Sequence, residues 1–282
     1  MKFQSYLSLA FAVLVFAVLV LAGAQPVVAQ DDVQTVALPL SRPGETVELR
    51  VKVTRGSIFV QGYDGSDVIV EGRNAAHEFD GHDDENESQR DGMRRLNTKS
   101  IAFAVEEKDN VVEVTSKSWN EDIRFDIKVP RRASLNLRTV NNGDVEVRDI
   151  EGELDLGNTN GDIAAYDISG SITAATTNGD VTVTMTKVTA NKAMAFTTLN
   201  GDIDVTFPSN LKADLRMRSS YGDLLTDFDV QVSAAPPKIE REATGSRVQV
   251  KVENEVSAKV GGGGPEFTFK SFHGDVVVRK GG

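Results

Sequence analysis

The sequence predicts an all-β protein: a parallel β-solenoid, or β-helix, with coils of about 18–22 residues and a less regular, β-rich N-terminal cap. Three observations predict this fold. A Gly–Asp turn recurs along the chain, apolar and polar residues alternate between the turns, and no long helical pattern follows the first thirty residues. One such repeat cannot bury its apolar face alone, so neighbouring repeats are expected to stack.

The first thirty residues have the features of a signal peptide. Residues 7–22 carry no charge, and small residues occupy positions −3 and −1 of a cleavage site after Ala29. We therefore expect residues 1–29 to be removed, so that the mature chain begins at Gln30 and is exported. A retained anchor is the alternative, because the apolar run approaches the roughly 18–20 residues of a spanning helix. No later segment is apolar enough to span, so no membrane span is expected after cleavage.

Charge and cysteine content restrict the partners. The chain has a net charge of −11 and no cysteine. An acidic surface repels phosphates, which predicts that neither nucleic acid nor anionic lipid is a partner. Without cysteine there is neither an acylated lipoprotein anchor nor a disulfide, so burial and backbone pairing must stabilise the fold. A mature chain of about 250 residues is long enough for that.

Residues 30–130 are predicted to form the β-rich cap. Several segments alternate between apolar and polar residues and are separated by turn signals. Residues 74–100 are polar without apolar periodicity, which predicts a mobile loop. His77, His82 and the acidic residues 83–85 lie in this loop, where no rigid element would preset a metal geometry. We interpret them as a solvated charged run.

Residues 131–282 are predicted to form the solenoid repeats. The strings NNGD, TNGD, TNGD and LNGD place Gly–Asp at positions 143–144, 161–162, 179–180 and 201–202, and degenerate copies SYGD and FHGD follow. Glycine also recurs at every ninth position from Gly143 to Gly179, which predicts two turns per coil. The predicted structural turn residues are Asn142, Gly143, Asn160, Gly161, Asn178, Gly179, Asn200 and Gly201.

The residues between the turns alternate with period two, as in half-buried strands. The second and fourth positions after each repeat glycine are apolar, as in Val145 and Val147 or Val181 and Val183. Glycine at the turn supplies positive φ or room for close stacking of coils. Asparagine before it tolerates left-handed backbone. Stacked coils would align these amides into an asparagine ladder, which is in doubt where Tyr221 and His273 replace asparagine.

Residues 230–265 are predicted to be an insertion between the penultimate and last coils. This stretch holds Pro236–Pro237, a hairpin pattern around residues 246–255, and the run Gly261–Gly264.

Several of these motifs resemble a bacterial family of candidate adhesins of unknown function, related to head domains of autotransporter-like adhesins. They are the Val129–Pro130 step, the following LNLRTVNNGDVEV, the serial NGD turns and the closing GGGGPEFTFKSFHGDVVVRK. The resemblance extends from Val36 to Lys280. It implies a non-enzymatic role at the surface or in the periplasm, and it carries no catalytic residues.

One carboxylate follows each repeat glycine. These residues are Asp144, Asp162, Asp180 and Asp202, with Asp223 and Asp275 in the degenerate copies. In a solenoid they would stack about 4.8 Å apart, where two charges repel by roughly 1 kcal/mol in water. Solvent and backbone N–H groups could offset this repulsion, or a divalent cation such as calcium could bind the column. The first explanation is favoured, because a calcium β-roll needs more than one glycine per nonapeptide.

Catalysis has little support in the sequence. There is no cysteine, no G-x-S-x-G and no P-loop, so we predict no catalytic residue, no metal and no cofactor. The predicted function is an exported, adhesin-like binding or cell-envelope interaction module whose ligand is a glycan or a protein. It would act in the periplasm, at the cell surface or after secretion. The alternatives are a cell-envelope structural or stress-signalling component and a β-helix glycan lyase or hydrolase. A groove of carboxylates with Lys or Arg and aromatics would favour the enzyme.

Overall fold

The computed structural model describes residues 33–75, 101–116, 121–141, 143–234, 238–244, 247–253 and 255–282. The predicted signal peptide, residues 76–100 with His77 and His82, and Asn142 lie outside these ranges. Within them the chain is all-β, as expected, with no α-helix. No helix in the described part is long and apolar enough to span a membrane.

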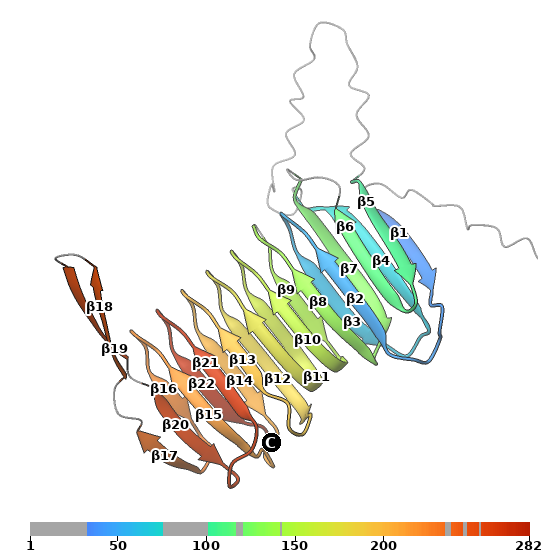
Figure 1. Ribbon diagram of the computed structural model, residues 1–282. Coiled ribbons are helices and arrows are strands. Elements are labelled where there is room, and N and C mark those ends of the chain that lie inside the picture. The colour runs from blue at the N-terminus through green and yellow to red at the C-terminus, as the bar shows by residue number, and fades with distance from the viewer. Residues whose placement is uncertain are drawn as a thin grey trace, which may run out of the picture.

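The strands form a stack of coils, each with one strand on either of two faces (Figure 1). Pairing along the middle of both faces is parallel. Face A runs, in spatial order, β5 (Phe103–Lys108), β6 (Val111–Ser116), β2 (Val47–Lys52), β8 (Ala133–Arg138), β10 (Glu151–Gly157), the second half of β11 (Ile163–Ala175), β13 (Met194–Thr197), β21 (Glu266–Lys270), β15 (Ala213–Arg218), β20 (Val256–Val260) and β17 (Val230–Ala234).

Face B runs β1 (Val33–Pro39), β4 (Asp67–Asn74), β7 (Ile123–Pro130), β3 (Ile58–Tyr63), β9 (Val145–Arg148), the first half of β11, β12 (Val181–Val188), β14 (Ile203–Phe207), β22 (Val276–Lys280) and β16 (Leu224–Thr226). A hairpin of β18 (Lys238–Thr244) and β19 (Arg247–Glu253) forms a separate sheet. Only β19 lies in the stretch 246–255 where the sequence predicts a hairpin, and its partner β18 precedes that stretch.

The core lies between the two faces. Alternate residues of each strand point inward, and those predicted from the period-two pattern are fully buried, as Val145, Val147, Val181 and Val183 show. Phenylalanines join the faces: the ring of Phe196 on β13 lies 6.2 Å from that of Phe207 on β14. The coils differ in length, as the pairing shows. Leu154 pairs with Ile172 in one coil, and Ala174 pairs in the next coil with Phe196, which is farther along the chain.

The coils do not follow one another in chain order at either end of the stack. The coil β2–β3 lies between β6–β7 and β8–β9. The coil β21–β22 likewise lies between β13–β14 and β15–β16. The sequence places the FHGD coil last, and this spatial order is wrong. The reason is local: β20 covers one edge of β15, and the turn at Gly261–Gly264 carries the chain round to the other edge.

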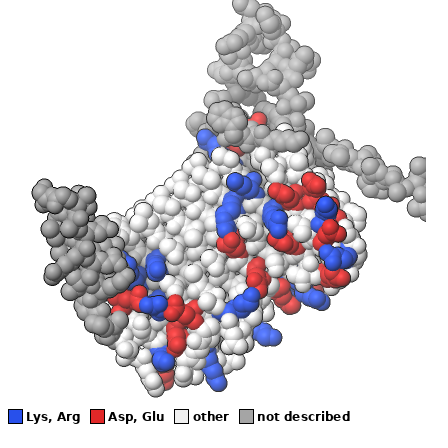
Figure 2. All heavy atoms as spheres, in the orientation of Figure 1, with Lys and Arg blue, Asp and Glu red and all other residues white. Residues whose placement is uncertain are grey.

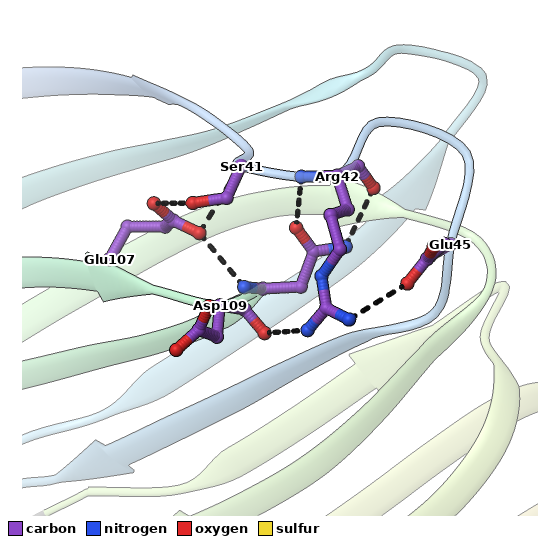
Figure 3. A network of polar contacts seen from close by, with 6 residues as sticks. Ser41, Arg42, Glu45, Glu107 and Asp109 are labelled. Atoms are coloured by element: carbon purple, nitrogen blue, oxygen red, sulfur yellow. Dashed lines mark hydrogen bonds and ion pairs between the residues drawn. The ribbon is translucent and has the colours of Figure 1, made fainter.

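Antiparallel strands cover the N-terminal end of the stack, and a polar network fastens the loop before β2 to them (Figure 3). The Glu107 carboxylate accepts hydrogen bonds from the Ser41 hydroxyl (2.8 Å) and from the N–H groups of Ser41 (3.1 Å) and Asn110 (2.9 Å). The buried Asn110 side chain bonds both backbone groups of Arg42, each at 2.7 Å. The hydrogen bonds to Glu107, led by the one from Ser41, lower the pKa of its carboxyl group.

Candidate functional site: the turn edge

Along one edge of the molecule, stacked turns connect face A to face B, and six of them carry the Gly–Asp repeat. We call the strip of these six turns the turn edge, and in spatial order its described residues are 139–141 with 143–144, 158–162, 176–180, 198–202, 271–275 and 219–223. Each turn follows the pattern of a hydroxyl or amide residue, a variable residue, a residue that is asparagine in most coils, glycine and aspartate. Equivalent positions therefore stack into columns.

The asparagine ladder is present. Each amide nitrogen donates to the amide oxygen of the preceding coil: Asn160 to Asn141 at 2.9 Å, Asn178 to Asn160 at 2.7 Å, and Asn200 to Asn178 at 2.7 Å. The ladder begins at Asn141 because that turn is one residue longer than the others; Asn142 lies outside the described residues. His273 continues it beyond Asn200, with its Nδ1 3.0 Å from the Asn200 oxygen.

The aspartate column forms a second ladder. The Oδ1 atom of each carboxylate accepts a hydrogen bond from the backbone N–H of the next aspartate, at 2.7–2.8 Å. The order is Asp144, Asp162, Asp180, Asp202, Asp275 and Asp223. The stacked carboxylates therefore accept hydrogen bonds from backbone N–H groups. No group of three His, Asp or Glu side chains in the described part could hold a metal ion.

A third column was not anticipated from the sequence. Side chains three residues before the glycine donate to the glycine carbonyl oxygen of the preceding coil, at 2.7–3.0 Å; the longer first turn places Thr139 four residues before. These side chains are Thr139, Asn158, Thr176, Thr198, Ser271 and Ser219. All but Ser219 are buried. The recurrence of Thr, Ser or Asn at this position was the available signal.

The glycine column allows the turns to approach. An added Cβ at Gly179 would lie 2.2 Å from the carbonyl oxygen of Gly161, and Gly179 has φ +148°. Both reasons given for glycine in the sequence, positive φ and close stacking, therefore apply at this position.

Exposed apolar side chains gather on the turn edge. The described part of the chain exposes six large hydrophobic side chains, and four of them, Val140, Leu199, Phe272 and Tyr221, lie in these turns. Tyr221 is 72% exposed and Phe272 40%. The rings of Tyr221 and His273 stack 4.7 Å apart, and Phe272 stands edge-on to both. We call Leu199, Tyr221, Phe272 and His273 the aromatic corner.

A shallow depression of about 250 Å³ on face B combines carboxylates, cations and an aromatic ring. Its lining includes Phe59, Asp126, Glu146 and Arg148. Arg124 and Arg73 both bind Asp126, at 3.1 and 3.2 Å. Arg148 binds Glu146 at 2.6 Å, which raises the pKa of Arg148.

Charges of both signs are interspersed on the surface. Figure 2 shows blue and red side chains mainly side by side over the N-terminal coils and near the opposite end, with a broad uncharged area between them. The turn edge, by contrast, carries one carboxylate per coil and no Lys or Arg in its six turns. This edge therefore disfavours anionic ligands.

The sequence model of the family described as Toastrack DUF4097 matches residues 44–260. No curated protein matches the chain. Among solved structures, a candidate cell adhesion protein from Clostridium sporogenes is similar at 11% identity and a TM-score of 0.44, over 89% of this chain and 100% of that one. A candidate adhesin from Bacteroides fragilis is similar at 11% identity and a TM-score of 0.39, over 89% and 98% of the two chains.

Proposed function

The chain belongs to the Toastrack DUF4097 family, and we propose from its surface and its N-terminal segment that it is an exported, non-enzymatic, adhesin-like binding module of the cell envelope. The segment 1–29 supports export, since it combines an uncharged apolar run with a cleavage site after Ala29.

The observation that carries the binding role is the gathering of exposed apolar side chains on the turn edge. Contiguous exposed apolar groups on a folded protein mark interaction sites, whereas single ones have no such meaning. Phe272 contacts Tyr221 through its ring, and the backbone N–H of His273 donates to the carbonyl oxygen of Leu199. We expect the turn edge beneath them to be rigid. Neighbouring turns are hydrogen-bonded through the asparagine, aspartate and Thr/Ser/Asn columns, and they pack closely at the glycine column.

A non-enzymatic role is proposed although face B holds carboxylates, cations and an aromatic ring together. Glycoside hydrolysis needs one carboxyl group as proton donor and a second as base or nucleophile. Two of the three carboxylates that line the depression, Asp126 and Glu146, are each paired with arginine. We expect the purified chain to release no reducing ends or unsaturated products from bacterial or plant polysaccharides.

Fractionation and sedimentation test the proposal. The full chain is produced with a C-terminal tag, and its mature N-terminus is sequenced from the extracytoplasmic fraction; Gln30 is expected. The purified mature chain is then mixed with isolated bacterial envelopes, with which it should co-sediment in a saturable way. Retention of residues 1–29 on a cytoplasmic chain would contradict export, and failure to co-sediment would contradict the binding role.

A further inference from the structure

We propose that the aromatic corner is a binding site for a neutral glycan. This inference rests on the proposed binding function and names its ligand class. It begins with a departure from the repeat: the ladder position is asparagine in four coils and becomes His273 and then Tyr221 in the last two.

Closing the asparagine ladder explains His273 alone. The Nδ1 of His273 meets the last amide oxygen of the ladder, that of Asn200, at 3.0 Å. Tyr221 has no such bond to make, and most of its side chain faces solvent. Phe272 occupies the variable position of its turn, and it is the only aromatic residue at that position among the six turns. The other five turns have Val140, Thr159, Thr177, Leu199 and Ser220 there. The corner thus presents more aromatic surface than the ladder requires.

The rings are already ordered. Tyr221 and His273 lie nearly parallel, at 14°, and Phe272 is edge-on to them at 76° and 90°. Such edge-on and offset packing is the favoured arrangement of aromatic rings. A ligand that stacks on Tyr221 therefore does not bear the cost of immobilising its side chain.

A carboxylate lies in the same turn as Tyr221. Asp223, two residues after Tyr221, ends the aspartate ladder, so no further coil donates to its carboxylate, and the described residues provide no other donor to it. A pyranose ring has an apolar C–H face, which packs on aromatic rings, and a rim of hydroxyl groups, which donate to carboxylates. The corner offers both chemistries within one turn.

Charge and size favour a neutral glycan over other ligands. Six stacked carboxylates run into the corner, and they repel uronic acids, phosphopolymers and nucleic acid. Protein–protein interfaces bury roughly 1,200–2,000 Å² of surface in total, and their cores are depleted of charge. Four side chains beside a row of carboxylates fit a few sugar units better than a protein.

Calorimetry with defined glycans tests the site. Mature protein is titrated with cellohexaose, mannan and chitohexaose as neutral probes and with polygalacturonate as the anionic control. We expect at least one neutral probe to bind and polygalacturonate not to bind. Tyr221→Ala and Phe272→Ala should each weaken binding about tenfold or more, which corresponds to about 1.4 kcal/mol. Tyr221→Trp should retain binding.

Leu225→Ala is the matched control, because Leu225 is 49% exposed in the same coil but lies on β16, outside the turn edge. It should bind like the parent, and all variants should keep the parent melting temperature. Three results would overturn the glycan site. They are binding by Tyr221→Ala and Phe272→Ala as tight as that of the parent, binding to polygalacturonate, and no binding to any neutral probe. Envelope co-sedimentation that survives in these variants would leave the proposed binding function standing without this site.

Discussion

Glycine at the turn edge allows close approach of neighbouring turns and a positive φ, and substitutions can measure the contribution of each to stability. Gly179→Ala places a Cβ 2.2 Å from the Gly161 carbonyl oxygen and imposes φ +148° on a residue with a side chain. Strain and overpacking each cost about 1–3 kcal/mol, so we expect a loss of roughly 2–6 kcal/mol in the free energy of unfolding. Denaturant titration measures it.

Gly262→Ala supplies the control, because Gly262 has φ +90° but open space around its Cβ position. It should lose only the backbone part, about 1–2 kcal/mol. Equal losses at Gly179 and Gly262 would show that close stacking of the turns contributes nothing.

The aspartate ladder needs an acceptor at each position but not a charge. Asp180→Asn keeps an oxygen for the N–H of Asp202 and removes repulsion from two neighbouring carboxylates. Because that repulsion is roughly 1 kcal/mol per pair in water, the variant should be as stable as the parent or slightly more stable. Asp180→Ala loses the acceptor and should cost about 0.5–1.5 kcal/mol.

Calcium distinguishes this account from a cation site. We expect calcium chloride to change the melting temperature of the parent no more than sodium chloride does at equal ionic strength. A calcium-specific rise that Asp180→Asn abolishes would follow from mass action at a site, and it would assign the column a functional role.

Glu107 links stability to pH. Its folded pKa is lowered, mainly by the hydrogen bond from Ser41, so folding favours the charged form. The contribution is therefore present above the unfolded pKa, ordinarily 4.5, and is lost as pH falls through the folded pKa. The parent should exceed Glu107→Gln in melting temperature at neutral pH, and the difference should shrink in acid. In Ser41→Ala, NMR titration should show a higher Glu107 pKa; an unchanged pKa would refute this cause.

At the scale of elements, the hairpin β18–β19 is an appendage. Its strands pair only with each other, in a sheet separate from the stack. Ala234 on β17 faces Val256 on β20, so a short turn can join them directly. Replacing residues 235–254 with a short Gly/Asn turn should leave the melting temperature within a few degrees. A large decrease would mean that the hairpin packs on the stack.

The sequence predicts the central strands well and the ends poorly, for a physical reason. Between Val145 and Val205 most inward positions follow period-two alternation, and the repeat glycines fix the register. Ile150 and Ile168 are also buried, but they lie outside that alternation. The antiparallel strands β1, β4 and β5 alternate in the same way, so alternation alone does not give their direction or their partner. The turn before Gly143 has one extra residue, which moves the ladder from Asn142 to Asn141. This extra residue is recognised only after the third column, of Thr, Ser and Asn side chains, has been identified.

The order of the turns in the aromatic corner was not predicted from the sequence. Chain order makes the SYGD and FHGD turns neighbours, but it places SYGD beside the LNGD turn. In the structure FHGD lies beside LNGD, so Phe272 and His273 adjoin Leu199 and Tyr221 ends the row. The arrangement of the candidate site therefore depends on the one connection that the repeat pattern does not encode.

At the scale of the whole molecule, both outer parts of the stack enclose a coil that is distant in sequence. The C-terminal coil β21–β22 has β13–β14 on one side and β15–β16 on the other. Its inward side chains Phe267, Phe269, Val276 and Val278 are fully buried. At about 1.5–3 kcal/mol each, their burial contributes on the order of 6–12 kcal/mol, which is comparable to the total stability of about 5–15 kcal/mol of an ordinary domain.

Truncation after Gly264 should therefore remove an internal coil and not an end. We expect β13–β16 to lose protection from hydrogen exchange, with a large fall in melting temperature. The hairpin deletion, of similar length, is the control and should cause neither effect. A synthetic peptide of residues 265–282 should bind the truncated chain and restore protection, because its strands find two open strand edges on each face. A truncated chain that melts like the parent would show that β15–β16 can dock directly on β13–β14, and that the enclosed coil is dispensable.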